Sequence, residues 1–201
     1  MGVRRVLRDF RESRQEKAER GKLGRWRRSV VAPAEGRVLE VGAGMGFSLP
    51  LFTRARTVAA TDPDVEALRR ARKRVASAPT KAWLLAADAQ YLPFRPHVFD
   101  AAVGALVFCS VPDPDRAFTE LQRVVRPGGA VRFLEHVRMR NPILAKLQDW
   151  ITPLNKIVAG GCHQNRATVE TARRSGLRVS AVRPHLKGYI VEVDAVVPEE
   201  A

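Results

Sequence analysis

The stretch from Arg37 to Asp62 constrains the fold of this 201-residue chain more than any other. It opens with the short apolar run 38–41, interrupted by Glu40, as in a strand that is buried on both faces of a parallel sheet. Three glycines then occupy every second position: Gly42, Gly44 and Gly46. Because glycine lacks a Cβ atom, this segment can turn sharply and let a ligand lie against the backbone.

The same stretch predicts a βαβ unit with an acid at the tip of its second strand. We expect a short helix at 47–53 and a strand at 57–61 that ends on Asp62, twenty residues after Gly42. A glycine turn followed by such an acid is the plan of nucleoside-cofactor sites. The dinucleotide fingerprint G-x-G-x-x-G is not met, because Phe47 stands in place of its third glycine.

Glu40 favours a cationic ligand, since a carboxylate beside a pyrophosphate would be unfavourable. Residues 38–46, V-L-E-V-G-A-G-M-G, resemble motif I of the class I S-adenosylmethionine (SAM) methyltransferases, whose cofactor carries a sulfonium and an ammonium group. The resemblance implies a single Rossmann-like, doubly wound α/β domain. Its mostly parallel seven-stranded sheet would have the strand order 3-2-1-4-5-7-6, with strand seven antiparallel.

Further segments match the same family. Asp88 follows the strand expected at 82–86. Residues 91–94 and 99–100 resemble the family's segment that leads into the fourth strand, expected at 101–108. Residues 121–129 read L-x-R-V-x-R-P-G-G, which resembles the family's signature before the fifth strand. The resemblance implies that the three glycines cradle the methionine end of SAM. It also implies that Asp62 accepts hydrogen bonds from the ribose hydroxyls and that Asp88 accepts one from the adenine amino group. The remaining expected cofactor-binding residues are Glu40, Ala89 and Leu106, with Val107 as an alternative to Leu106.

The rest of the chain supplies the remaining elements of one domain, without an internal repeat. Helices are expected at 65–77, at 114–125 with Asp113 as its N-cap, and at 165–175. Further strands are expected at 131–136, 179–183 and 189–197, with a turn at 126–129 before the first of them.

The acceptor side is less constrained. The chain reads F-C-S-V at 108–111, where amino-methylating nucleic-acid enzymes place D-P-P-Y or N-P-P-Y, which argues against base N-methylation. His136 ends the strand expected at 131–136, and imidazole can take a proton near neutral pH. His136 and His163 are therefore the catalytic candidates, with structural roles as the alternative. Cys109 and Cys162 have no metal-ligand spacing, so we expect packed thiols and no metal site.

Residues 137–161 form an unusual insert between the last parallel strand and the last helix. Its apolar residues fall mostly on one helical face, interrupted by Pro153. Together with E-H-V-R at 135–138 and G-C-H-x-N-R at 161–166, the insert resembles a subgroup that holds thiol methyltransferases and bacterial phospholipid or ubiquinone-type methyltransferases. The acceptor atom stays open among S, N, O and C.

The net charge of +14 favours anionic partners, although an Arg-rich solvated surface would also explain it. Residues 1–28 hold eleven Lys or Arg against four acids, with a short apolar stripe at Val3, Val6, Leu7 and Phe10. We expect a basic N-terminal helix or arm at 1–28, broken by Gly21 and Gly24, before a domain at 29–201. Such a helix can lie on an anionic membrane or pack over the cofactor cleft.

These features predict a SAM-dependent methyltransferase that acts on a small or lipid-like acceptor. The chain shows neither an apolar signal-peptide core nor a run of about 18 apolar residues, so we expect a cytoplasmic protein with peripheral contact to anionic membranes. Nucleic acid is a less favoured partner. The alternative is a non-catalytic basic adaptor on the same fold that binds nucleic acid or membrane.

Overall fold

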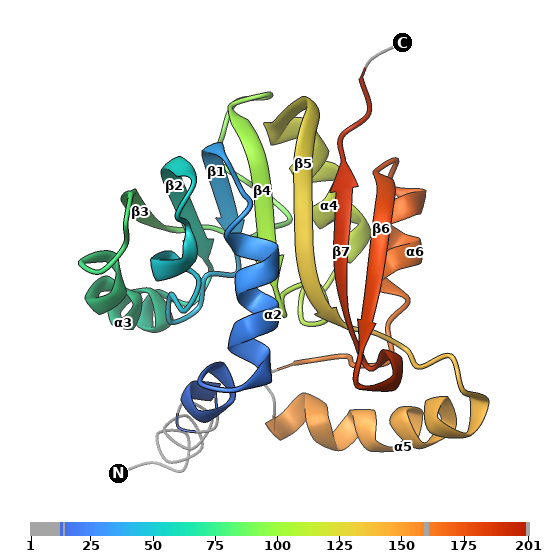
Figure 1. The fold of residues 1–201 in the computed structure, drawn as a ribbon. Helices are drawn as coiled ribbons and strands as arrows, with labels where there is room; N and C mark the ends of the chain where they lie inside the picture. Colours follow the sequence, from blue (N-terminus) through green and yellow to red (C-terminus); the bar gives the residue numbers. More distant parts are fainter. Residues whose placement is uncertain (1–12, 14, 159–160, 200–201) are drawn as a thin grey trace.

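The computed structural model describes residues 13, 15–158 and 161–199, and over these residues seven strands form one sheet (Figure 1). The order is β3-β2-β1-β4-β5-β7-β6, and β7 is antiparallel to both neighbours, which confirms the predicted topology. The strands are β1 (Gly36–Val41), β2 (Ala55–Asp62), β3 (Lys81–Ala86), β4 (Phe99–Ala105), β5 (Val125–His136), β6 (Arg178–His185) and β7 (Ile190–Val196).

Helices cover both faces of the sheet, as the doubly wound plan requires (Figure 1). They are α2 (Lys22–Val31), α3 (Val65–Val75), α4 (Pro114–Val124), α5 (Pro142–Val158) and α6 (Thr168–Arg174), with the short 3-10 helices η1 (Leu49–Leu51) and η2 (Leu186–Gly188). Residues of α4 and α6 pack in one apolar core, and residues of α2, η1 and α3 pack in the other.

Strand β1 lies between these two cores because its side chains alternate between them. Leu39 and Val41 belong to the core under α4 and α6, whereas Val38 belongs to the core under α2 and α3. Glu40 is also buried, so it is a titratable group within the otherwise apolar run 38–41 of β1. Since β1 pairs with β2 on one side and β4 on the other, its C-terminal end lies at the middle of the sheet edge.

Helix α5 runs beneath the sheet edge at which β4 and β5 end, and it extends below β7 and β6 (Figure 1). Its inner side is anchored by Gln148, whose amide donates to the Val137 carbonyl at 2.9 Å. On its outer side the apolar residues Ile143, Leu147 and Trp150 are 77%, 49% and 82% exposed. Within the described part of the chain, no helix has the length and the apolar character needed to cross a bilayer.

Three expected elements near the cleft and in β5 differ from the structure. Strand β4 ends at Ala105 instead of residue 108, because Leu106 takes a φ of +62° that leaves the strand conformation. The expected turn at 126–129 belongs to β5, where Gly128 donates to the Val197 carbonyl at 2.9 Å. The helix expected at 47–53 shrinks to η1, with Pro50 among its three residues.

The N-terminal segment also differs from its prediction. Gly21 is the N-cap of α2, but Gly24 lies inside this helix, where a Cβ would overlap the backbone carbonyl of Glu19. Gly24 therefore permits close packing instead of ending the helix. Helix α2 continues across the expected boundary at residue 28, and the apolar stripe at Val3, Val6, Leu7 and Phe10 lies outside the described residues.

The last helix is shorter than expected. It begins at Thr168 instead of residue 165, and it ends at Arg174. Asn165 remains in the preceding loop, where its amide donates to the Asp149 carboxylate of α5 at 2.8 Å. The loop at 161–167 is therefore held against α5 before α6 begins.

Candidate functional site

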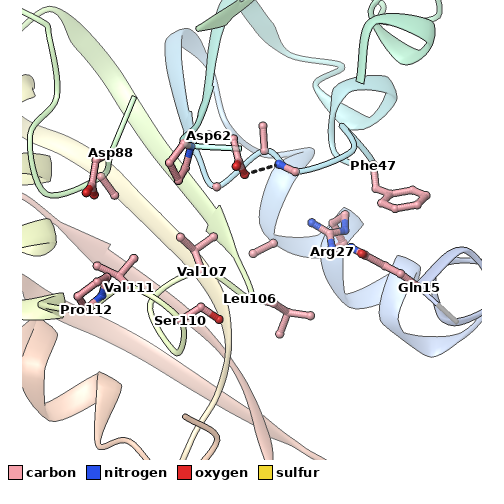
Figure 2. Close-up of a pocket in the computed structure, with 16 residues that line it drawn as sticks. Gln15, Arg27, Phe47, Asp62, Asp88, Leu106, Val107, Ser110, Val111 and Pro112 are labelled. Atoms are coloured by element: carbon pink, nitrogen blue, oxygen red, sulfur yellow. Dashed lines mark hydrogen bonds between the residues drawn. The ribbon is translucent and has the colours of Figure 1, made fainter. Parts of the chain in front are cut away.

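A cleft of about 490 Å³ opens where β1, β2 and β4 end (Figure 2). Its volume lies in the range of small-molecule and cofactor sites. The lining residues are Gln15, Arg27, Gly42, Ala43, Gly44, Phe47, Asp62, Pro63, Asp88, Ala89, Ala105, Leu106, Val107, Ser110, Val111 and Pro112. Six of the eight cofactor-binding residues predicted from sequence are in this set, and the other two are Glu40 and Gly46.

Asp62 forms the polar corner of the cleft. One carboxylate oxygen accepts the backbone N–H of Gly44 at 2.8 Å (Figure 2), and the other accepts the N–H of Asp64 at 2.8 Å. Burial raises the pKa of Asp62, while these two hydrogen bonds lower it. Because a carboxylate oxygen offers more than one acceptor site, Asp62 can still receive hydroxyl donors from a ligand.

The three glycines have different roles. Gly44 has a φ of +52°, and no described atom lies within 4 Å of the position that a Cβ would take. A Cβ on Gly42 would overlap the side chain of Val107. Gly46, in contrast, faces the protein interior, where a Cβ would lie 2.8 Å from Leu49 and 3.0 Å from Ala71. Gly42 and Gly44 thus form the floor of the cleft, and Gly46 lets α3 pack against the turn.

Glu40 lies behind the cleft wall, buried on β1. Desolvation raises its pKa to about 7, although a hydrogen bond with Ser48 and the charge of Arg27 act in the opposite direction. Among the described residues, its Oε2 atom has no hydrogen-bond partner. A buried carboxylate oxygen without a donor is an environment that a nearby cation would stabilise.

Arg27 connects this buried acid to α2 and was not identified from sequence. Its guanidinium donates to Ser48 Oγ at 3.1 Å and forms an ion pair with Glu19 at 2.7 Å. Figure 2 shows Arg27 beside Phe47 and Gln15 at one side of the cleft. Only its position in the fold reveals this role, because in the sequence Arg27 is one of many arginines.

The opposite wall holds the remaining predicted cofactor residues. Asp88 accepts hydrogen bonds from the backbone N–H of Gln90 at 2.9 Å and from its side-chain amide at 2.8 Å. Ala89, Leu106 and Val107 add an apolar surface beside this carboxylate. The wall therefore combines one acid with a flat apolar surface, a combination that suits a purine ring with an exocyclic amino group.

Glu135 supports this wall, a role that the sequence did not indicate, although the residue belongs to the E-H-V-R segment at 135–138. Its buried carboxylate accepts the backbone N–H groups of Val107, Phe108 and Cys109 at 2.5, 2.8 and 3.2 Å. Burial raises the pKa of Glu135, while these hydrogen bonds lower it. Holding three successive N–H groups fixes the sharp loop that begins at Leu106.

The predicted catalytic histidines lie next to the cleft, beyond its described lining. His136 Nδ1 is 3.7 Å from Cys162 Sγ and 4.0 Å from Cys109 Sγ, and the ring packs against Tyr189. His163 Nδ1 is 2.8 Å from the Gly161 carbonyl oxygen. Catalytic roles for the two histidines stay predictions.

The fold brings the two cysteines together. Their Sγ atoms are 3.3 Å apart, and the Cys109 Sγ atom is 3.8 Å from Ser110 Oγ, which belongs to a lining residue. The hydrogen bond with Cys109, followed by contact with His136, lowers the pKa of Cys162 to about 5. The same sulfur contact and burial raise the pKa of Cys109.

Taken together, the fold and the cleft define the class of protein. The sheet order, the glycine turn and the acids at the ends of β2 and β3 are those of a class I, SAM-binding methyltransferase domain. Residues 39–133 match the family model described as a methyltransferase domain.

Individual comparisons agree. The chain is 40% identical over 114 residues to phosphatidylethanolamine N-methyltransferase of Cereibacter sphaeroides, an alignment that covers 55% of the chain but only 56% of that enzyme. It is 28% identical to human thiol S-methyltransferase TMT1A, over 77% of the chain and 70% of the relative. The fold is shared with a SAM-dependent methyltransferase of Methanosarcina mazei, with a TM-score of 0.66 and 20% identity over 85% and 96% of the two chains.

The residues of the cleft fit the cofactor of this family. Gly44 leaves the space a Cβ would fill, Asp62 keeps acceptor capacity, and Glu40 offers a carboxylate oxygen that no described donor satisfies. These three features suit a nucleoside with a cationic sulfonium side chain.

Proposed function

We propose that the chain is an active SAM-dependent methyltransferase and that its acceptor is a small or lipid-like molecule. The observation that carries the first part is the hydrogen bond between Asp62 and Gly44. It fixes Asp62, the acid expected to bind the ribose of the cofactor, against the glycine turn. The names of two relatives support the second part, because one is a phospholipid methyltransferase and the other a thiol methyltransferase.

Each wall of the cleft has a separate task in this proposal. Bound SAM supplies a methyl group on a sulfonium that is already a good leaving group. Gly42 and Gly44 would hold the methionine end against the backbone. Asp62 would accept hydrogen bonds from the ribose hydroxyls, and Asp88 would accept one from the adenine amino group. Leu106 and Val107 exclude water from the ring. Positioning and water exclusion are then the main contributions of the protein.

The acceptor is proposed to enter from the side of α5. This helix runs along the sheet edge at which β4 and β5 end (Figure 1), and its face of Ile143, Leu147 and Trp150 is exposed. In this proposal the face receives the apolar part of an acceptor at the surface, before the acceptor reaches the cleft. A strictly polar acceptor would gain nothing from it.

We further propose that this face lies against anionic lipid surfaces. Three large apolar residues spaced i, i+4 and i+7 form one side of a helix, and the chain has a net charge of +14. A basic protein with an apolar helix face would meet a lipid-like acceptor at the membrane surface, where it is concentrated.

Calorimetry with SAM, S-adenosylhomocysteine and NAD tests the cofactor part. We expect binding of the first two and no comparable binding of NAD. Release of S-adenosylhomocysteine is then measured with a panel of apolar thiols, phenols, quinols and phosphatidylethanolamine. Binding without turnover on any acceptor, together with salt-sensitive binding to nucleic acid, would favour the non-catalytic adaptor instead.

A further inference from the structure

Three metal-ligating side chains converge beside the cofactor cleft. Cys109, His136 and Cys162 come from three separate segments, yet their ligand atoms all lie within 4.8 Å of one another. Both thiols are buried, and the imidazole directs Nδ1 at the two sulfur atoms. The proposed methyl transfer uses none of the three.

The separations agree with those in a tetrahedral zinc site. Zinc–sulfur bonds of about 2.3 Å and zinc–nitrogen bonds of about 2.0–2.1 Å place tetrahedral ligand atoms roughly 3.6–3.8 Å apart. In this structure the Sγ–Sγ distance is 3.3 Å, and the two Sγ–Nδ1 distances are 3.7 and 4.0 Å. Shifts of a few tenths of an ångström would bring all three atoms into range.

The backbone around the three ligands is already fixed. Glu135 holds the N–H group of Cys109 at 3.2 Å, and the N–H group of His163 donates to the Cys109 carbonyl at 2.7 Å. Arg166 donates from the loop that carries Cys162 to the Phe108 carbonyl at 2.8 Å. Hydrogen bonds therefore tie the loops of the two cysteines together without any cation, as a preorganised site requires.

We propose that Cys109, His136 and Cys162 bind one soft divalent cation of the zinc class and leave its fourth position open to an exogenous thiol. Two thiolates and a neutral imidazole are ligands that such a cation prefers over Mg²⁺ or Ca²⁺. Three protein ligands are typical of sites that keep a position for water or substrate. Ser110 joins the site to the cleft, since its Oγ is 3.8 Å from Cys109 Sγ.

This assignment gives His136 the role of a ligand in place of the general base expected from sequence. It does not depend on the proposed methyltransferase activity, because cation binding is measured without SAM or acceptor. Two competing interpretations exist: a pair of packed thiols beside a histidine, and a disulfide between Cys109 and Cys162. Each of these interpretations predicts a different result from the cation site in a metal titration under reducing conditions.

The first test is the cation content of the full chain, purified without chelator and kept reduced. Elemental analysis should find about one zinc per chain. After removal of zinc, Co²⁺ should bind one-to-one and give thiolate-to-cobalt charge-transfer absorption together with the intense visible bands of tetrahedral cobalt. Cys162→Ser, Cys109→Ser and His136→Ala should each weaken Co²⁺ binding at least tenfold. The control His97→Gln alters a histidine outside the cluster and should bind as the unaltered chain does.

A second test addresses the open position. Benzenethiol added to the cobalt-loaded chain should raise the charge-transfer absorption by about half, as the thiolate ligands increase from two to three. An unchanged spectrum would mean a closed site and would overturn this part of the proposal. Failure of the fully reduced chain to bind Co²⁺, or equal binding by Cys162→Ser, would overturn the cation site. Thermal melting of each variant checks that it is folded.

Discussion

The carboxylate of Asp62 accepts the backbone N–H of Gly44 at 2.8 Å, although eighteen residues separate the two in the sequence. This hydrogen bond joins the tip of β2 to the turn after β1. Asp62, which would bind the ribose, and the Gly44 backbone, which would hold the methionine end, are therefore held together before any ligand binds. A change at Asp62 should act on ligand binding and on the turn together.

Asp62→Asn tests this corner. An amide keeps the size of the side chain but loses the charge, and it presents donors toward the Gly44 N–H or the ligand hydroxyls. We expect SAM affinity to fall by about 10- to 100-fold, because hydrogen bonds to a charged acceptor contribute about 1.5–3 kcal/mol. Isothermal calorimetry at fixed pH and salt measures the change.

Asp64→Asn is the matched control. Asp64 caps α3 by accepting the N–H groups of Glu66 and Ala67, and asparagine caps helices about as well as aspartate. Its SAM affinity should stay within about twofold of the unaltered chain. If the two variants lose affinity equally, Asp62 has no special role in binding.

Gly44→Ala and Gly46→Ala should fail in different ways. Both have positive φ, so alanine costs about 1 kcal/mol at either position. At Gly44 the methyl group projects into open space, so we expect SAM binding to weaken more than folding. At Gly46 it meets Leu49 and Ala71, so urea unfolding should show an additional loss of roughly 1–3 kcal/mol. Equal losses of stability in both variants would contradict this division of roles.

The cofactor site could be predicted because its signals are local. The glycine turn and Asp62 belong to one βαβ unit, and Asp88 follows the next strand, so the parallel topology places them at one edge. The strand order also follows from the family resemblance. The sequence prediction assigned all three glycines to the methionine end and did not distinguish Gly46, whose role depends on how closely α3 packs against it.

The cluster of Cys109, His136 and Cys162 could not be predicted because its members are 26 and 27 residues apart. Short ligand spacings in one segment are what a sequence motif records, and this cluster has none. Glu135 was hidden for a similar reason, because its partners are backbone N–H groups of a loop that leaves the strand earlier than expected. The positive φ of Leu106, which no residue preference indicates, creates that loop.

Glu40→Gln should change how stability depends on pH. Burial raises the folded-state pKa of Glu40 to about 7, from an ordinary value of 4.5. Between these values the folded chain holds more protons than the unfolded chain, so stability falls as pH rises through this window and then levels off. The shift corresponds to roughly 3 kcal/mol.

Urea unfolding at several pH values from 5 to 8 gives the comparison. The free energy of unfolding of the unaltered chain, relative to that of Glu40→Gln, should fall between about pH 5 and 7 and stay flat above. The difference between the two chains isolates Glu40 from Asp62 and Glu135, whose pKa values are also raised. Parallel curves would mean that Glu40 titrates in the folded chain as it does in the unfolded one.

The exposed face of α5 leads to the last prediction. Leu147→Ser combined with Trp150→Ser removes two of its three large apolar side chains, which are 49% and 82% exposed. We expect binding to anionic vesicles to weaken at least about tenfold, because partial burial of two such side chains contributes more than 1.4 kcal/mol. SAM affinity should stay within about threefold, since neither residue lines the described cleft.

Trp83→Ser is the matched control, because this tryptophan of β3 is 49% exposed at the far edge of the sheet. Its vesicle binding should equal that of the unaltered chain. Co-sedimentation should increase with the fraction of anionic lipid and decrease with salt, as basic residues near the surface contribute about 1 kcal/mol each. If Trp83→Ser and the α5 variant behave alike, or if neutral and anionic vesicles bind equally, α5 is not the membrane contact. Its apolar face would then serve the acceptor alone, and the double variant should raise the KM for an apolar acceptor without changing vesicle binding.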